Sequence, residues 1–393
     1  MGKSIEQFLS HRSEMVGSTF SRQTSVPTPG AITLSGGTPD FDTPPHIIEA
    51  AIKALKDGAT KYTAWPGITS LREALADKLL CDQKVKVDPG SELLVTLGAQ
   101  GAIMGTIMAT INPGDEVIIP TPFFDEYRRD IMLAGGVMVP VPTREANDFQ
   151  VQPADIEKAV TEKTKMIILV TPCNPTGAVA QPAELEGIAE IARKHDLLVV
   201  SDEIYEKYIY DGNKHTSIAS LPGMWERSII IHSFSKTYGM TGFRVGFIAA
   251  RPEIIKGILP INHGMTICAP AAFQWASQAA LTGPMDWFEV ILKEYDKRRR
   301  MWMSALDEMG LTYGRPKGAY YVMFNVTSTG LSSRDFAQAM RNDAKVIIGS
   351  GGGPTDQSNE GYNRGSFAVP TKQLEEGLAR MIPVVRKMKA CNR

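Results

Sequence analysis

A lysine in a serine-rich segment is the first candidate for covalent chemistry in this chain. Lys236 follows Ser233 and Ser235 directly after an apolar run, and Arg244 comes shortly afterwards. A lysine that emerges at the dry edge of a sheet is desolvated, which lowers its pKa and leaves a nucleophilic amine for Schiff-base chemistry. The two hydroxyls and the arginine suit a phosphate dianion. A solvated loop lysine is the alternative, and these neighbours argue against it.

Other polar segments also follow apolar runs that are predicted to be strands. Asp202 and Tyr205 follow the run 197–201, and Asn174 stands in an Asn-Pro-Thr-Gly turn after the run 165–170. Taken alone, Asp202 also suits the start of a helix, and Asn174 suits a simple turn. Ligands of open parallel sheets lie beyond the carboxyl ends of the strands, so these side chains are candidates for a binding site.

The order of these motifs resembles the class I/II aminotransferases of the fold-type I pyridoxal-phosphate enzymes, the aspartate aminotransferase superfamily. The similarity runs over most of the chain, and its most specific part is Ser-x-Ser-Lys-x7-Arg-x-Gly at 233–246. It implies that Lys236 forms a Schiff base with pyridoxal 5'-phosphate, while Ser233, Ser235 and Arg244 hold the cofactor phosphate.

The resemblance also assigns contacts to the cofactor ring. It implies that Asp202 keeps the pyridine nitrogen protonated, so that the ring can act as an electron sink. Tyr205 and Asn174 are implied to donate to the phenolate oxygen of the ring, and Phe124 to stack on its face. Further phosphate contacts are implied for four residues, the last of them reaching a neighbouring subunit: Gly98, Ala99, Gln100 and Tyr62.

Substrate binding is implied for a smaller set. Arg364 matches the arginine that binds the α-carboxylate, for which a bidentate guanidinium fork is the natural partner. Gly37 matches a turn whose backbone approaches the substrate closely, and a contact with the substrate is implied for Asn174 as well. Trp65 departs from the small or polar residue expected beside Tyr62, and we expect it to line the pocket and favour apolar or aromatic substrates.

The implied reaction exchanges the amino group between an L-amino acid and a 2-oxo acid by a ping-pong route, with Lys236 as proton carrier. Two alternatives stay open. The same residues serve lyases, decarboxylases, racemases and oxidases that use this cofactor, and a non-catalytic protein could keep the fold as a binding module. A dinucleotide-binding fold is disfavoured because the glycines at 98, 101 and 105 do not form GxGxxG. The spacing of the cysteines and histidines predicts no metal site.

Apolar runs and helical segments alternate over most of the chain, which predicts the elements that position this site. Seven short apolar runs, most of them separated by helical segments, predict a mainly parallel seven-stranded sheet flanked by helices. The pattern after Pro284 predicts a smaller α+β domain. We therefore expect an N-terminal arm that joins the small domain at 1–45, a large cofactor-binding domain at 46–284 and a small C-terminal domain at 285–393. The seven runs are 92–97, 116–120, 137–141, 165–170, 197–201, 228–232 and 244–250.

The overall composition is that of an ordinary globular protein. The chain has 393 residues, 42 Lys and Arg, 43 Asp and Glu, and 43% apolar residues, which argues against disorder and nucleic-acid binding. Glycine, proline and polar residues interrupt the long uncharged stretches 93–114 and 257–285, so no membrane span is predicted. Four widely separated cysteines and the lack of an export signal favour the cytoplasm. The implied contact from Tyr62 predicts a homodimer with shared active sites.

Overall fold

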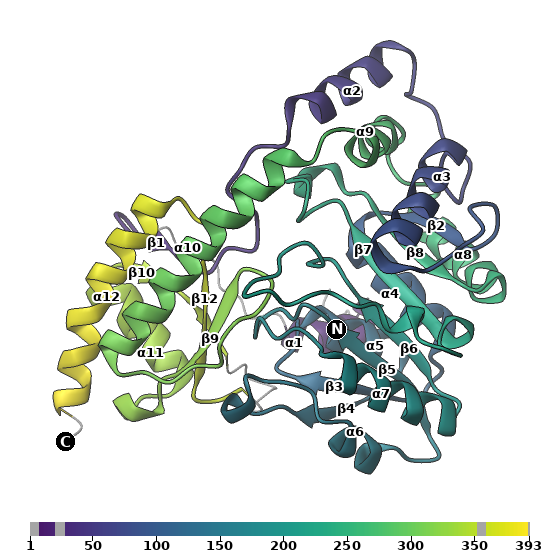
Figure 1. Cartoon of the computed structure of the whole chain (residues 1–393). Helices are drawn as coiled ribbons and strands as arrows, with labels where there is room; N and C mark the ends of the chain where they lie inside the picture. Colours follow the sequence, from purple (N-terminus) through teal and green to yellow (C-terminus); the bar gives the residue numbers. More distant parts are fainter. Residues whose placement is uncertain (1–7, 20–27, 352–358, 392–393) are drawn as a thin grey trace, which may run out of the picture.

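The computed structural model describes residues 8–19, 28–351 and 359–391, and its centre is a seven-stranded sheet (Figure 1). The strand order is β2-β8-β7-β6-β5-β3-β4. Strand β8 pairs antiparallel with β2 and β7, and the other neighbours are parallel. The predicted α/β class and its mainly parallel seven-stranded sheet are confirmed. The strands are β2 (Leu93–Thr96), β3 (Glu116–Thr121), β4 (Val137–Pro142), β5 (Thr164–Val170), β6 (Leu198–Asp202), β7 (Ser228–Ser233) and β8 (Gly246–Ala250).

Helices cover both faces of this sheet because its central strands are apolar on both faces. In β3, the side chains of Val117 and Ile119 pack with one group of helices, whereas Ile118 packs with the other, as the twofold alternation of a strand requires. The first group is α4 (Gly98–Thr110), α5 (Glu126–Ala134) and α8 (Pro252–Thr266), and the second is α6 (Pro153–Ala159) and α7 (Pro182–Lys194). Three further helices pack near β2 and β8: α2 (Pro45–Lys56), α3 (Thr69–Lys78) and α9 (Ala271–Thr282).

A second group of elements lies to one side of the large sheet (Figure 1), and all of them except the first strand follow that sheet in the sequence. Its antiparallel sheet has the order β11-β12-β9, and β1 pairs with β10 in a separate two-stranded ladder. The long helices α10 and α12 pack against one another on this sheet. The elements are β1 (Ile32–Thr33), α10 (Asp286–Met309), β9 (Tyr321–Asn325), α11 (Ser333–Ala339), β10 (Val346–Ile347), β11 (Gly349–Ser350), β12 (Tyr362–Ser366) and α12 (Thr371–Cys391).

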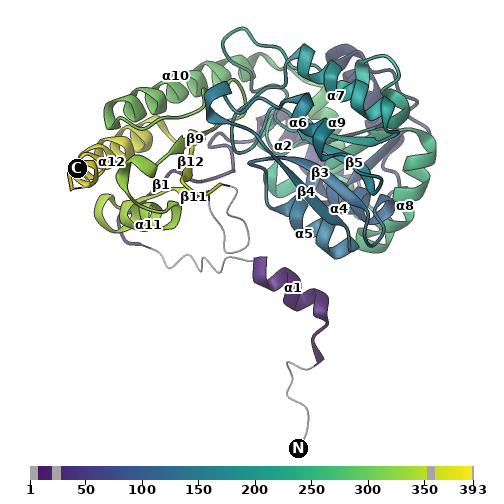
Figure 2. The same ribbon diagram turned by 90° about the horizontal axis from the view of Figure 1, so that it is seen from below.

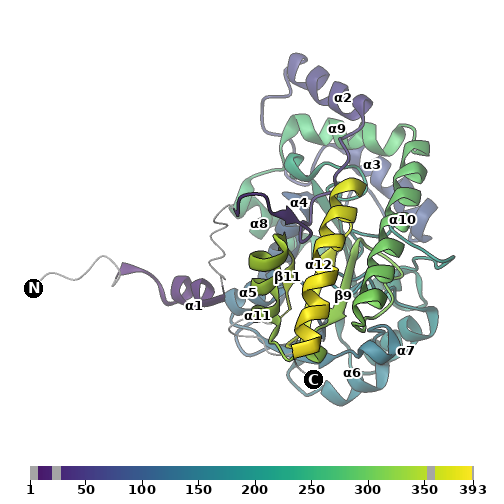
Figure 3. The same ribbon diagram turned by 90° about the vertical axis from the view of Figure 1, so that its left-hand side faces the viewer.

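The N-terminal arm expected from the sequence contains a helix in its described part. Residues His11–Thr19 form helix α1, which lies beside α5 (Figures 2 and 3). The segment 28–45 then joins the second group of elements through β1. The arm is therefore partly helical, and residues 1–7 and 20–27 lie outside the described part of the chain. Among the helices in the described ranges, none is both long and apolar enough to cross a bilayer.

A glycine beside the predicted substrate arginine provides a test of the packing between β12 and α10. A Cβ on Gly365 would lie 2.6 Å from Cζ2 of the fully buried Trp302. We expect Gly365→Ala to lower the free energy of unfolding by about 1–3 kcal/mol, because an added methyl group overpacks a core. Chemical denaturation of the purified protein measures the change.

The matched control is Gly257 in α8, where an added Cβ has open space. Gly257→Ala should raise the free energy of unfolding by about 0.5–1 kcal/mol, since glycine disfavours a helix interior. Equal effects from the two variants would contradict the described packing of Trp302.

Candidate active site

One cavity of about 440 Å³ collects most of the predicted site residues. It lies at the carboxyl ends of β5, β6 and β7, where parallel strands bring their following loops together. The start of α4 forms another part of its wall, and β9 and β12 complete it from the second sheet. The predicted residues that line it are Gly37, Ala99, Gln100, Phe124, Asn174, Asp202, Tyr205, Ser233, Ser235, Lys236, Arg244 and Arg364.

The amine of Lys236 projects into this cavity from the loop that follows β7. Its Nζ donates a hydrogen bond of 2.6 Å to the carbonyl oxygen of Gly37. Burial lowers the pKa of Lys236 to about 8, with Asp202 opposing this and the positive charges of Arg244 and Arg364 adding to it. A substantial fraction of the amine is therefore neutral in mildly alkaline solution and can act as a nucleophile or a base.

Asp202 is the last residue of β6 and lies at the floor of the cavity, with 3% of its surface exposed. The hydroxyl of Tyr127 donates to one carboxyl oxygen, and the backbone N–H of Ile204 donates to the other at 3.1 Å. Burial raises the pKa of Asp202, and both hydrogen bonds oppose that rise. A buried acid held in this way can stabilise a positive charge on a ring nitrogen.

The end of β7 and the start of α4 form a cradle for an anion. The hydroxyl of Ser233 donates to that of Ser235 at 2.9 Å. Arg244 has the left-handed conformation (φ 56°, ψ 48°), and its guanidinium lies so close to Gly98 that a Cβ there would be 2.6 Å from Nη2. Gly98 begins α4, whose free N–H groups attract anions. A cation, two hydroxyls and a helix N-terminus thus lie together.

Arg364 reaches the opposite wall of the cavity from β12. Its Nη1 donates to Oδ1 of Asn174 at 2.9 Å, and its Nη2 donates to the carbonyl oxygen of Ser35 at 3.0 Å. Its Nε is buried without a hydrogen-bond partner. A guanidinium oriented by two neighbours presents a fixed fork to a carboxylate. Because Oδ1 of Asn174 accepts from Arg364, the Nδ2 group of this amide remains available as a donor.

Three other predicted residues border the cavity. Tyr205 is buried, and burial raises the pKa of its hydroxyl well above the ordinary value, so that it stays protonated as a donor. Phe124 is 39% exposed and borders the cavity. The side chain of Gln100 turns toward α5, where its Nε2 donates to Oδ2 of Asp130 at 3.0 Å. Burial raises the pKa of Asp130 to about 7.

Tyr62 and Trp65 lie apart from the described residues that line this cavity. Tyr62 is 78% exposed and Trp65 is 54% exposed, and the Trp65 ring packs on His263 with centroids 4.3 Å apart. The predicted role of Tyr62 in a neighbouring site therefore requires a second copy of the chain. The same holds for Trp65 as part of a substrate pocket.

Sequence reasoning missed two tyrosines at this site. Tyr127 contacts Asp202, and Tyr321 lines the cavity from β9. Tyr127 falls about one helical turn after Phe124, a spacing that can place two side chains on one face. Nothing in the strand pattern around Tyr321 indicates that this residue faces a cavity in another part of the fold.

The chemistry of the cavity fits pyridoxal phosphate. An amine of lowered pKa suits its aldehyde, the cradle of hydroxyls, arginine and helix N-terminus suits its phosphate, and a buried acid suits its ring nitrogen. Hydroxyl and amide donors lie near the amine, and Arg364 offers a separate place for a substrate carboxylate.

Comparisons with known proteins agree with this chemistry. Residues 29–381 match the family model of aminotransferase class I and II. The chain is 44% identical to an aspartate aminotransferase of Pyrococcus abyssi, covering 91% of this chain and 92% of that protein. It is 41% identical to the aromatic-amino-acid aminotransferase 2 of Thermococcus litoralis, covering 92% and 93%. The solved aromatic aminotransferase of Pyrococcus horikoshii superposes with a TM-score of 0.89 at 43% identity, covering 91% and 96%.

The chain belongs to the class I and II aminotransferases. It is a pyridoxal-phosphate-dependent enzyme that exchanges amino groups between amino acids and 2-oxo acids.

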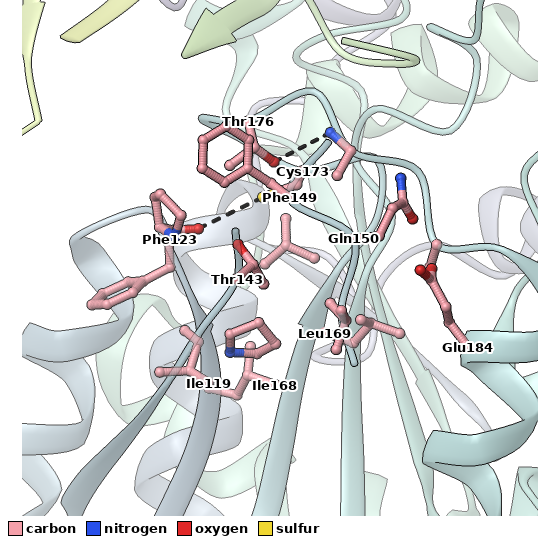
Figure 4. Close-up of a pocket in the computed structure, with 16 residues that line it drawn as sticks. Ile119, Phe123, Thr143, Phe149, Gln150, Ile168, Leu169, Cys173, Thr176 and Glu184 are labelled. Carbon is pink, nitrogen blue, oxygen red and sulfur yellow. Dashed lines mark hydrogen bonds between the residues drawn. The ribbon is translucent and has the colours of Figure 1, made fainter. Parts of the chain in front are cut away.

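A second, smaller cavity of about 20 Å³ in this aminotransferase is lined in part by Cys173 and Thr176, which follow β5 (Figure 4). It has room for about one water molecule. The thiol of Cys173 contacts the carbonyl oxygen of Pro122 at its wall, with 3.8 Å between the two atoms. Burial raises the pKa of this thiol, so it is a poor nucleophile. Within the described ranges, no three His, Cys, Asp or Glu side chains are grouped to hold a metal ion.

The lowered pKa of Lys236 gives a testable pH dependence in the aminotransferase freed of its cofactor. Below about pH 8 this amine is protonated and unreactive, and above it the neutral amine forms. Reductive methylation followed by peptide mass spectrometry should therefore give a labelling rate for Lys236 that is half-maximal near pH 8. Exposed lysines have an ordinary pKa of about 10.4.

Asp202→Asn provides the matched variant for this measurement. The carboxylate raises the pKa of Lys236, so its removal should move the midpoint to lower pH. A midpoint at the ordinary lysine value in both proteins would contradict the described burial of the amine.

Proposed function

We propose that this aminotransferase transfers the amino group of α-amino acids through Lys236, with Asp202 and Arg364 in the roles that their positions suggest. The observation that supports this most is the convergence of the three groups on one cavity. A lysine of lowered pKa, a buried acid and an oriented guanidinium supply the base, the partner of the ring nitrogen and the carboxylate site.

Each residue acts on a defined atom in this proposal. Pyridoxal phosphate, when bound, supplies the aldehyde and a ring that delocalises negative charge from the α-carbon. The Nζ atom of Lys236 removes the α-proton of the amino acid and returns it at the carbonyl carbon of the cofactor. Asp202 holds the ring nitrogen protonated, and Tyr205 with Asn174 donates to the ring oxygen. Arg364 fixes the α-carboxylate, which orients the α-hydrogen toward Lys236.

The phosphate group and the ring face account for the remaining predicted residues. Ser233, Ser235 and Arg244 bind the phosphate together with the start of α4, where Gly98, Ala99 and Gln100 stand. Phe124 stacks on the ring. The exposed position of Phe124 at the cavity edge supports this assignment.

Single-turnover chemistry tests this function. An amino acid added without an oxo acid should release one equivalent of the matching 2-oxo acid per active site, with no ammonia, carbon dioxide or peroxide. Those other products mark lyases, decarboxylases and oxidases, and loss of optical purity without oxo acid marks a racemase. Arg364→Lys should lower kcat/KM by roughly a hundredfold, because a single ammonium cannot replace the guanidinium fork. An unchanged kcat/KM in this variant would count against the carboxylate assignment.

We also propose that the preferred donors have apolar or aromatic side chains. Among the described residues that line the cavity, the cations are Lys236, Arg244 and Arg364, and each has a role already. A second carboxylate would face neutral walls such as Ile103 and Phe124. Trp65 of the neighbouring copy is proposed to extend this apolar surface. Relatives of the chain are named for both aspartate and aromatic amino acids.

A donor panel tests the preference. We expect kcat/KM for phenylalanine, tyrosine and leucine to exceed that for aspartate and glutamate by at least about tenfold. A factor of this size is expected when one polar group of the bound substrate is left without a partner. Trp65→Ala should narrow this ratio, whereas Trp275→Ala, at another half-exposed tryptophan, should leave it unchanged. If Trp65→Ala leaves this ratio of kcat/KM values unaltered, Trp65 does not line the substrate pocket.

We propose a homodimer in which Tyr62 reaches the phosphate of the partner's cofactor. The high exposure of Tyr62 in the single chain, away from its own cavity, supports this arrangement.

The proposed division into 1–45, 46–284 and 285–393 fits the separate hydrophobic clusters of the two sheets. We further propose the cytoplasm as the place of action, in keeping with the free thiols of Cys81, Cys173 and Cys268.

Mixing two inactive variants tests the shared site. A Lys236→Ala subunit keeps Tyr62, and a Tyr62→Ala subunit keeps Lys236, so a hybrid dimer should contain one intact site and regain activity. A mixture of Lys236→Ala with Asp202→Ala should stay inactive, because both changes fall in the same cavity. Activity that does not return in the first mixture would place Tyr62 outside the partner's site.

A further inference from the structure

Tyr321 contacts several of the groups that the proposed function relies on. Its hydroxyl lies 3.1 Å from that of Tyr205. Its ring lies beneath the guanidinium of Arg364, with Cζ 4.5 Å from the ring centroid. A Cβ on Gly37 would stand 3.0 Å from the Tyr321 hydroxyl, so the glycine leaves room for it. With 1% of its surface exposed, Tyr321 is held by these neighbours.

The strand register explains why Tyr321 meets Arg364. In the antiparallel pair of β9 and β12, Arg364 stands opposite Met323, two residues beyond Tyr321. Tyr321 and Met323 share one face of the strand, so Arg364 and Tyr321 are diagonal neighbours on that face. Tyr205 follows β6 of the large sheet instead. The hydroxyl pair therefore joins the two sheets directly at the active site.

We propose that Tyr321 is a positioning residue with two separable parts, a hydroxyl that orients the donor Tyr205 and a ring that orients the substrate arginine Arg364. The proposal deepens the proposed function and rests on the roles assigned there to these two residues. Through these two contacts, one side chain affects both the electronic state of the cofactor ring and the binding of the α-carboxylate.

The role of the hydroxyl depends on which side chain donates the hydrogen bond in the buried pair of Tyr321 and Tyr205. The neighbouring Tyr320 donates its proton to the carbonyl oxygen of Gly37 at 2.7 Å. The hydroxyls of Tyr321 and Tyr205 lie 3.1 Å apart, and either can donate to the other. When Tyr321 donates to Tyr205, the proton of Tyr205 is free for the cofactor's ring oxygen, and chained hydrogen bonds strengthen one another. Without the Tyr321 hydroxyl, Tyr205 becomes a weaker donor, and the negative ring oxygen is less stabilised.

The ring part follows from the contacts of Arg364. Asn174 and Ser35 hold its two terminal nitrogens, while its Nε is buried without a partner. The Tyr321 ring supports the flat face of the guanidinium, where a cation is attracted by the π electrons. Loss of the ring leaves the fork free to tilt, which weakens carboxylate binding more than it changes the cofactor.

Two variants separate these parts in the full-length holoenzyme. The visible absorption band of the lysine-bound cofactor changes with pH. The pH at the midpoint of this change reports how tightly the proton shared by the Schiff-base nitrogen and the ring oxygen is bound. Tyr321→Phe removes only the hydroxyl, so the midpoint should rise by about half a pH unit, with KM for the amino acid within twofold of wild type. Tyr321→Leu removes the ring as well and should also raise KM by roughly three- to tenfold.

Tyr210→Phe is the matched control. Tyr210 is buried nearby and donates to the carbonyl oxygen of Ala319 at 2.8 Å, but it does not line the cavity in the described chain. It should leave both the midpoint and KM unchanged, and circular dichroism verifies that all three variants fold.

Three results would overturn the proposal: a midpoint in Tyr321→Phe equal to that of wild type, a KM in Tyr321→Leu equal to that in Tyr321→Phe, or equal shifts in Tyr210→Phe. Failure of the proposed function looks different, because the wild-type enzyme would then release no equivalent of 2-oxo acid in the single-turnover assay, whatever the Tyr321 variants do.

Discussion

The active site depends on burying an amine and an acid in the same cavity without neutralising the acid completely. Burial lowers the pKa of Lys236 and raises that of Asp202, so desolvation alone favours the uncharged forms of both. For the amine this is useful, since a neutral Nζ can act as a nucleophile and a base. For the acid it is a cost, and the hydrogen bonds from Tyr127 and Ile204 offset it. The other groups of the cavity are arranged around these two.

The parallel sheet sets the spacing of that arrangement. Val170 stands opposite Asp202, and Asp202 stands opposite Ile231, so the three strands end at nearly the same level. The residues that follow, Asn174 after β5 and Ser233 at the end of β7, therefore reach one cavity with little freedom to move apart. The antiparallel strand β8 closes this arrangement from the other side, because the chain enters it just after Arg244 and leaves that guanidinium against the start of α4.

The part of the site that follows strand ends could be predicted from the sequence. Apolar runs locate the strands, and parallel strands bring the residues that follow them to the same edge of the sheet. Lys236 and Asp202 belong to this part. Tyr321 does not, since its position depends on how two separately formed sheets pack, and no local pattern encodes that angle. The partly helical arm at His11–Thr19 has weak local signals of its own and lies against α5. The proposed role of Trp65 depends on a second chain, which one sequence describes only through resemblance.

Packing between the two sheets also explains the many tyrosines at their boundary. The loops that form the site contain buried carbonyl groups outside any regular ladder, and each needs a donor. Tyr208 donates to the carbonyl oxygen of Lys236, and Tyr320 donates to that of Gly37. Phenylalanine at these two positions would fill the same space but leave the carbonyl oxygens unpaired. Tyr208 and Tyr320 therefore hold the backbone around the reactive lysine, and they contribute both to the packing of the core and to the geometry of the site.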